Sequence, residues 1–465
     1  MTGLVSRLGS GLALAALCGC AVGPNYHRPA AAVTVAPAYK EVGDWKPSEP
    51  ADALARGPWW TLFADDELSR LESRIAISNQ NVRAAADAFA QSRALVAEAR
   101  AGYWPTVGAS VGPQRGSVDG SRPRTTVAAG ATADWTLDIW GQIRRSVESN
   151  RASAQASDAA LAAATLSAQS DLATDYFELR AQDELQRLLD DIVTAEKLSL
   201  KITESRYRFG VAAKADVVSA QAQLLNSEAQ QVNAAIQRGI LEHAIAVLVG
   251  EQPAAFSLAP AAMRTDVPTV PAGVPSTLLE RRPDVAEAER KVAAANAQIG
   301  VAESAWFPSL TLTGSDQYQG STFSRLLDTS THVWSIGPQL AETLIDGGLR
   351  RAQVAAARSA YAVTVDTYRQ TVLAGFEQVE DEIVTLRVLE KQAVIEQAAV
   401  AASVEAEKLT LNQYKAGTVP YSSVITAQTT RLASEETALT VLSDRLQASV
   451  ALIDALGGGW TASKL

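Results

Sequence analysis

The sequence of 465 residues predicts a mainly α-helical protein with a small β part, built from two similar halves. Three observations support this fold class. Very long segments contain good helix formers and almost no glycine or proline. Other segments alternate apolar and polar residues with the period of two that is typical of strands. Finally, the same order of segments, namely helix, two strands, very long helix and shorter helix, occurs twice along the chain.

The duplication is visible as matches at a nearly constant offset. The segment Tyr207–Gly210 recurs 207 residues later as Tyr414–Gly417, with the tyrosine and the glycine retained. The same offset relates residues of the helices that follow: Val217 and Val424, Ala220 and Ala427, Gln221 and Gln428, and Gly250 and Gly457. This constancy indicates an internal repeat, which replaces the estimate of about three domains from chain length alone. We expect a first repeat at 61–260, a linker at 261–275, a second repeat at 276–459 and a tail at 460–465.

The first twenty residues predict an export signal that ends at a lipid-bearing cysteine. A positively charged start precedes the apolar run Gly11–Leu17, which is too short to span a bilayer. The segment Leu17-Cys18-Gly19-Cys20 resembles the end of a lipoprotein signal, so we expect a signal peptide at 1–19 and diacylglycerol and N-acyl chains on Cys20. An ordinary signal peptide with a different cleavage point is the alternative. Residues 20–60 are rich in proline and alanine, which predicts an extended, lipidated N-terminal strap.

Two very long helices are expected, one in each repeat. Residues 142–209 contain neither glycine nor proline, and residues 349–416 contain only Gly375. Each segment would make a helix roughly 100 Å long at about 1.5 Å per residue. Apolar residues spaced three and four apart, with many alanines between them, favour close packing of one helix on another. Shorter helices are expected at 66–101, 214–250 and about 276–305.

Four strands are expected, at about 105–112, 125–140, 309–319 and 332–346. From Val127 to Ile139 every second residue is apolar, while the residues between them are small or polar. This alternation is typical both of outer-membrane barrel strands and of a half-buried soluble sheet, and the upstream lipid signal favours the barrel. Natural membrane barrels have at least about eight strands, and open edges are not tolerated in lipid. Several chains, whether two, three or more, must therefore pool their strands.

Composition and motifs exclude several functions. The net charge is −10, whereas nucleic-acid binding requires a basic face. Both cysteines lie before residue 21 and the three histidines are far apart, so no disulfide framework, cofactor or metal site is expected. No spacing typical of a catalytic nucleophile, a phosphate loop or a zinc protease occurs, so we expect neither an enzyme nor catalytic residues. A coiled-coil outer-membrane lipoprotein without channel activity is the main alternative to a channel.

Motifs along most of the chain carry a family resemblance. They are Cys20–Pro29, Trp59-Trp60, Asp138–Arg145, Arg281–Pro308, Gly337–Gln339, Leu344–Gly348 and Tyr414–Gln428. These motifs are similar to those of the TolC family of outer-membrane efflux factors, specifically the lipoprotein branch that serves RND-type pumps. The resemblance implies a homotrimer with a 12-stranded outer-membrane β-barrel, continuous with a periplasmic α-helical barrel. It also implies a passive exit duct for drugs or other small toxic compounds, held in outer-membrane lipid, with a periplasmic adaptor (membrane fusion protein) and an inner-membrane RND-type pump as partners.

The resemblance also assigns roles to the turns that follow the two long helices. Both turns would form a periplasmic tip, where the adaptor docks and the tunnel closes. The expected docking residues are Tyr207, Gly210, Tyr414 and Gly417. Many relatives have a gate aspartate five residues after the tyrosine that matches Tyr421, and a leucine one residue after it. Here those positions hold Thr426 and Ser422, and the nearest acidic substitute is Asp216, so the gate candidates are Asp216, Ser422 and Thr426.

Overall fold

The computed structural model describes residues 21–30, 38–42, 58–117, 123–270, 281–323 and 332–459. The predicted signal peptide, the lipid-bearing Cys20, part of the strap and the tail at 460–465 lie outside the described residues. Within the described ranges, no helix combines the length and the apolar character that crossing a bilayer requires.

The chain forms two compact units, and each unit takes segments from both repeats. What we call the sheet unit comprises 1–32, 87–158 and 287–370, and what we call the turn unit comprises 33–86, 159–286 and 371–465, each over its described residues. The two very long helices, α4 (Gln142–Arg208) and α8 (Leu349–Ala416), begin in the sheet unit and end in the turn unit. The repeats are therefore interleaved within both units.

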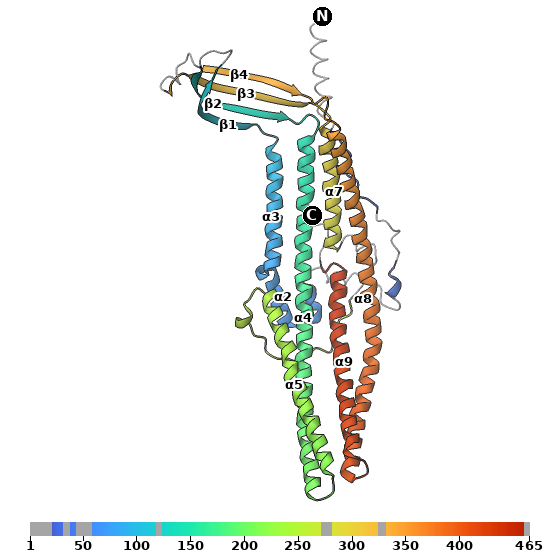
Figure 1. The fold of residues 1–465 in the computed structure, drawn as a ribbon. Coiled ribbons are helices and arrows are strands. Elements are labelled where there is room, and N and C mark those ends of the chain that lie inside the picture. Colours follow the sequence, from blue (N-terminus) through green and yellow to red (C-terminus); the bar gives the residue numbers. More distant parts are fainter. Residues whose placement is uncertain are drawn as a thin grey trace. The chain divides into compact units, whose positions relative to one another are not determined.

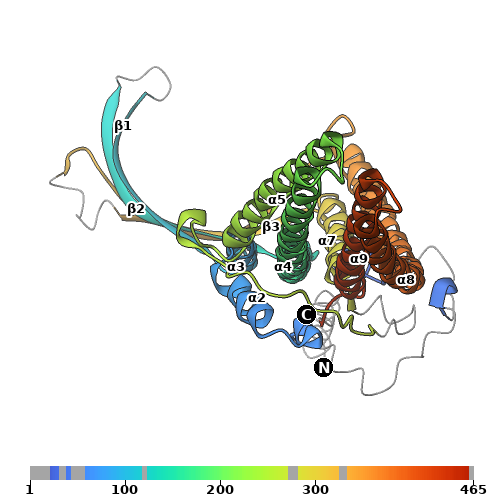
Figure 2. The same cartoon turned by 90° about the horizontal axis from the view of Figure 1, so that it is seen from below.

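The sheet unit contains one antiparallel sheet in the order β1–β2–β3–β4, and its strands curve along their length (Figures 1 and 2). Its strands are β1 (Thr106–Gly116), β2 (Arg124–Leu137), β3 (Ser309–Gly320) and β4 (His332–Ala341). The two repeats meet at the centre of the sheet, where β2 of the first pairs with β3 of the second. Each of the outer strands, β1 and β4, has one edge that no described strand of the chain covers.

The first strand is longer than expected. β1 continues to Gly116 rather than ending at 112, and Pro113 stays in register opposite Val127. Within a sheet, proline occurs mainly on edge strands, and β1 is an outer strand of this sheet.

The strands that precede the two long helices are shorter than expected. β2 ends at Leu137 rather than 140, and β4 ends at Ala341 rather than 346. In each case an aspartate that follows the strand, Asp138 or Asp346, accepts hydrogen bonds from the amides of the next helical turn. These amides belong to Ile143 and Arg144, both at 2.9 Å, and to Gly348 and Arg350, at 2.9 and 3.2 Å. The Arg350 side chain and the same amides lower the pKa of Asp346 to about 2.

The remaining helices differ from the expectation at two places. They are α2 (Asp66–Ser78), α3 (Gln80–Ala101), α5 (Lys214–Leu248), α7 (Pro283–Ser304) and α9 (Tyr421–Ala455), with short 3-10 turns η1 (Lys40–Val42), η3 (Trp59–Phe63) and η4 (Pro253–Ala255). Within the helix expected at about 276–305, Arg282 is not helical, and α7 begins at Pro283, whose fixed φ angle favours the first helical position. Residues 276–280 lie outside the described ranges.

The helix expected at 66–101 is interrupted at Asn79. This residue has an extended backbone (φ −66°, ψ 124°), and its side-chain oxygen accepts hydrogen bonds from the amides of Asn81 and Val82, at 2.9 and 3.1 Å. Its side-chain amide donates to the Leu248 carbonyl at 2.8 Å. The continuous-helix expectation was wrong because a capping side chain fixed by the end of α5 starts a new helix here.

Residues 21–30 of the strap pack against the sheet unit's own helices. Arg145 of α4 donates to the carbonyls of Val22 and Gly23 and to the Asn25 side chain, at 3.0–3.1 Å. A Cβ atom on Gly23 would lie 2.4 Å from the Cα atom of Gly300 in α7. Gly300 therefore does not break α7, and it allows the strap to approach this helix closely.

Among the described residues, the turn unit has one large apolar core and smaller apolar clusters nearer its turns. The large core includes Trp59 and Phe63 of η3 together with residues of α2, α4, α5, α8 and α9. The Phe63 ring contacts Phe177 of α4, with centroids 4.8 Å apart. These contacts hold the helix pairs α4–α5 and α8–α9, whose connecting turns lie at the same end of the unit (Figure 1).

Candidate functional site

The two turns at the end of the turn unit have the same backbone construction. Gly210 and Gly417 both have positive φ angles, +73° and +81°. Next to each glycine, an amide bonds to a carbonyl five residues earlier: Val211 to Arg206 at 2.8 Å, and Thr418 to Gln413 at 3.0 Å. This is the hydrogen bond of a left-handed helix cap, and glycine adopts the required conformation without strain.

The side chains of the two turns differ. In the first turn Phe209 and Val211 are 82% and 63% exposed, and Tyr207 is 44% exposed. In the second turn the matching tyrosine, Tyr414, is only 3% exposed and packs edge-on against Tyr421, with centroids 5.1 Å apart. Of the two predicted docking tyrosines, only Tyr207 is accessible in the single chain.

One arginine joins the two turns. The Nη1 atom of Arg206 donates to the Lys415 carbonyl at 2.6 Å, and its guanidinium lies over the Tyr414 ring, 4.9 Å from the centroid. The ring of Tyr421 is held on its other side by a 3.1 Å hydrogen bond between its hydroxyl and Ser199 of α4. Sequence reasoning missed Arg206, Phe209 and Val211; apolar residues on both sides of a turn glycine were the available signal.

The three gate candidates lie at this same end. Ser422 and Thr426 are exposed, one helical turn apart on α9, and the Thr426 hydroxyl donates to the Ser422 carbonyl at 3.0 Å. Asp216 is half-buried in the first turn of α5. Burial raises the pKa of Tyr421, its hydrogen bond with Ser199 partly offsets this, and Glu196, then Tyr414 and last Asp216 raise the pKa further. The acidic candidate therefore belongs to the electrostatic surroundings of the buried tyrosine pair.

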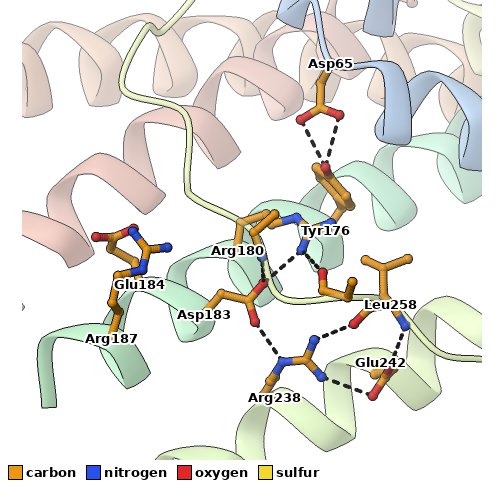
Figure 3. A network of polar contacts seen from close by, with 11 residues as sticks. Asp65, Tyr176, Arg180, Asp183, Glu184, Arg187, Arg238, Glu242 and Leu258 are labelled. Atoms are coloured by element: carbon orange, nitrogen blue, oxygen red, sulfur yellow. Dashed lines mark hydrogen bonds and ion pairs between the residues drawn. The ribbon is translucent and has the colours of Figure 1, made fainter. Parts of the chain in front are cut away.

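Away from the turns, a buried charge network joins α4, α5 and the segment after η4 (Figure 3). Asp183 of α4, whose side chain is 1% exposed, accepts from Arg180 at 2.8 Å and from Arg238 of α5 at 2.7 Å. Both arginines also donate to the main chain, to the Ala259 carbonyl at 2.8 Å and the Leu258 carbonyl at 2.6 Å. Because each buried charge has several partners, the network fixes α5 against α4 at this level.

A groove of about 460 Å³ runs between α4 and α9 in the turn unit. Three carboxylates line it, those of Glu178, Glu436 and Asp444. Beside it on α4, burial followed by the charges of Asp171 and Glu178 raises the pKa of Asp175 to about 6. In the part of the chain that the structure describes, no histidines, cysteines or carboxylates form a group suited to hold a metal ion.

The sheet has one apolar face and one polar face. The paired residues Ala133 and Gly314, Trp135 and Leu312, and Leu137 and Leu310 continue the apolar face across its centre. The polar face carries the intervening serine, threonine and glutamine residues: Ser110, Thr132, Thr136, Thr311, Thr313, Ser315, Gln317, Ser335 and Gln339. Apolar side chains on the two outer strands are largely exposed in one copy, as for Val107 (70%) and Ile336 (69%). The sheet therefore suits a position with lipid on its apolar face and water on its polar face.

Comparison with known proteins places these features in one family. Residues 71–251 and 274–458 match the outer membrane efflux protein family. The pyoverdine export outer membrane protein OpmQ of Pseudomonas aeruginosa is 29% identical over 428 residues, covering 89% of this chain and 90% of that protein. The cation efflux system protein CusC of Escherichia coli is 26% identical over 455 residues, covering 96% and 97%.

A solved structure supports the same assignment. That of the outer-membrane channel OprN is 27% identical and covers 95% of this chain and 100% of that chain, with a TM-score of 0.87. The chain therefore belongs to the outer membrane efflux protein family, the trimeric outer-membrane channels of tripartite efflux systems, which are transport proteins and not enzymes.

Proposed function

We propose that three copies join their sheets into one 12-stranded barrel and that the chain acts as a passive exit duct. The observation that carries this proposal is the sheet with an apolar face, a polar face and two open edges. A sheet in lipid must have no free edge, and pairing β4 of one copy with β1 of the next removes both. The family match in two segments, 71–251 and 274–458, supports the repeats proposed at 61–260 and 276–459.

The tip would combine two functions. The exposed Phe209 and Val211, with Tyr207, form an apolar surface that suits the docking of a periplasmic adaptor. The gate would lie beside it, at Asp216, Ser422 and Thr426. Hydroxyls rather than carboxylates at the α9 positions favour a gate without a dense ring of negative charge.

The lipid anchor and the strap belong to this proposal as well. Diacylglycerol and N-acyl chains on Cys20 would hold the chain in the outer membrane, since two or more acyl chains anchor a protein firmly. The hydrogen bonds of Arg145 with the strap keep the residues after Cys20 against the sheet unit.

The pump would supply the energy and most of the substrate choice. The relatives export compounds as different as pyoverdine and cations, according to their names. We therefore propose drugs or other small toxic compounds as cargo, delivered by an RND-type pump and its adaptor.

The proposal is tested in two measurements. The lipidated protein, purified in detergent, should form ion-conducting pores in a planar bilayer, whereas a coiled-coil spacer passes no current.

The second measurement is efflux, measured as drug resistance in a deletion strain complemented with Phe209→Ser/Val211→Ser. Resistance should be lost while trimer and conductance persist, and the exposed Lys214→Ala variant of the same turn should behave as the unaltered protein. Full resistance in the double variant would argue against docking at this turn.

A further inference from the structure

One end of the apolar face of the sheet carries polar side chains. Asp316 of β3 lies in register opposite Trp334, and Tyr318 lies opposite His332. The Nε2 atom of His332 is 2.6 Å from an Asp316 carboxylate oxygen, and its ring stacks on Tyr318 with centroids 4.9 Å apart. The Asp316 side chain is nevertheless 63% exposed. An acidic group on an apolar face thus has room for another partner.

The opposite edge of the sheet brings a complementary charge to the same face and the same end. Arg115 of β1 pairs with Thr125 and follows Val111 and Pro113 in the alternation, so it lies on the apolar face as the last residue but one of the strand. Its side chain is exposed, and no other described residue forms an ion pair with it. Within one copy, β2 separates Arg115 on β1 from Asp316 on β3, and the two residues do not form an ion pair.

Two requirements limit how β4 of one copy can pair with β1 of the next. The apolar faces must stay on one side, and because a shift of one residue turns a strand over, only every second register is possible. The strands must also tilt by about 35–45°, as in outer-membrane barrels. The tilt is set by the number of residues by which the pairing is displaced along the strands from one copy to the next.

The pairing within one copy supplies the starting point for this register. Residues in line across the sheet are Thr106, Asp134, Thr313 and Gly337. If Gly337 pairs with Ser110 or with Gly112 of the next copy, strand spacings of about 4.8 Å and rises of about 3.3 Å give tilts of about 35° or about 46°. These registers place Arg115 of the partner subunit directly opposite His332 or Trp334.

We propose that Arg115 of the partner subunit lies beside the Asp316–His332 pair and forms a charged contact that closes one end of each junction between copies. The inference rests on the trimeric barrel proposed above. In both registers the arginine lies opposite or diagonal to His332, within the reach of cross-strand side-chain pairs. A guanidinium is always charged and binds a carboxylate with two parallel hydrogen bonds, so it can add a second partner to the exposed Asp316 carboxylate beside the His332 ring.

Cysteine pairs test the register directly, because the sequence has no cysteine after Cys20. Full-length protein with Arg115→Cys and either His332→Cys or Trp334→Cys is oxidised in the membrane and run on a non-reducing gel. We expect one of the two pairs to give covalent dimers and trimers. Arg115→Cys with Val333→Cys is the matched control, since Val333 lies on the other face, and it should stay monomeric on the gel.

A charge exchange gives a second, independent readout. Arg115→Asp and Asp316→Arg should each lower the temperature at which the trimer dissociates in detergent, and the double variant should recover most of the loss. The contact would be overturned if only the Val333→Cys pair cross-linked, or if neither apolar-face pair did. It would also be overturned if the double charge variant showed no recovery of trimer stability. If the unaltered protein is not trimeric by native mass spectrometry, the proposed function fails instead.

Discussion

The two turns at the end of the turn unit share a backbone and differ in side chains. Each has a left-handed glycine and the same five-residue amide-to-carbonyl bond, 207 residues apart. The first turn exposes Phe209 and Val211, whereas the second buries Tyr414 against Tyr421. Both turns thus keep the backbone geometry that reverses the chain. The first turn provides an accessible apolar surface, and the second provides a buried aromatic pair.

The largest expected effect is the difference in stability between a variant at the buried Tyr414 and a variant at the exposed Phe209. Tyr414→Ala should destabilise the turn unit by about 3–5 kcal/mol, because it removes a buried ring and leaves a cavity. Phe209→Ala, at an exposed position, should cost less than about 0.5 kcal/mol. Hydrogen exchange of the amides at 411–425 measures both, with the unaltered protein as reference. Equal protection in the two variants would contradict the division between the turns.

The next effect tests the shared backbone. Gly210→Val and Gly417→Val should each cost about 1–3 kcal/mol, since a β-branched residue is strained at positive φ, although open space surrounds Gly210 and only the Arg206 side chain, at 3.7 Å, approaches Gly417. The two losses should be similar, and efflux should fall without loss of the trimer. Thermal unfolding and drug resistance measure the two consequences. A loss at only one glycine would show that the turns are not equivalent even in their backbones.

The smallest effect concerns the buried tyrosine alone. Because burial raises the pKa of Tyr421 above its ordinary value, the folded state keeps this proton longer than the unfolded chain does. Its contribution to stability is therefore complete below about pH 10 and falls as the pH rises through the folded-state value. Absorbance of tyrosinate during alkaline titration should lose one late step in Tyr421→Phe. An unchanged late portion of the curve would mean that this hydroxyl titrates as if exposed.

The sequence predicted those helices and turns that depend only on the residues of their own segment. The long helices at 142–209 and 349–416 were expected from composition and are observed as Gln142–Arg208 and Leu349–Ala416. The turn glycines were predicted because Gly210 and Gly417 recur at the same offset and the family resemblance places a turn there, and the structure adds that both have positive φ angles. In contrast, the break at Asn79 depends on the Leu248 carbonyl, 169 residues away in sequence. No local pattern contains that contact.

The candidate site was less predictable than the fold for a similar reason. Tyr207 and Tyr414 match in sequence, and only packing against Tyr421 and Arg206 makes one of them inaccessible. Alternation predicted the faces of the sheet, whereas Asp138 and Asp346 lie where the strands were expected to continue and instead accept hydrogen bonds at the starts of α4 and α8. Side chains that bond to distant main-chain atoms decide these details.

The network around Asp183 has a consequence for how the chain tolerates mutation. Arg180, Arg238 and Asp183 bind the main-chain atoms of Leu258, Ala259 and Ala261. The side chains of the two alanines take no part in these bonds, so replacing either leaves the path of the segment unchanged. The course of this connection between the repeats is therefore fixed in part by three charged residues on neighbouring helices, and the exposed Ala259 and Ala261 can be exchanged without loss of these bonds.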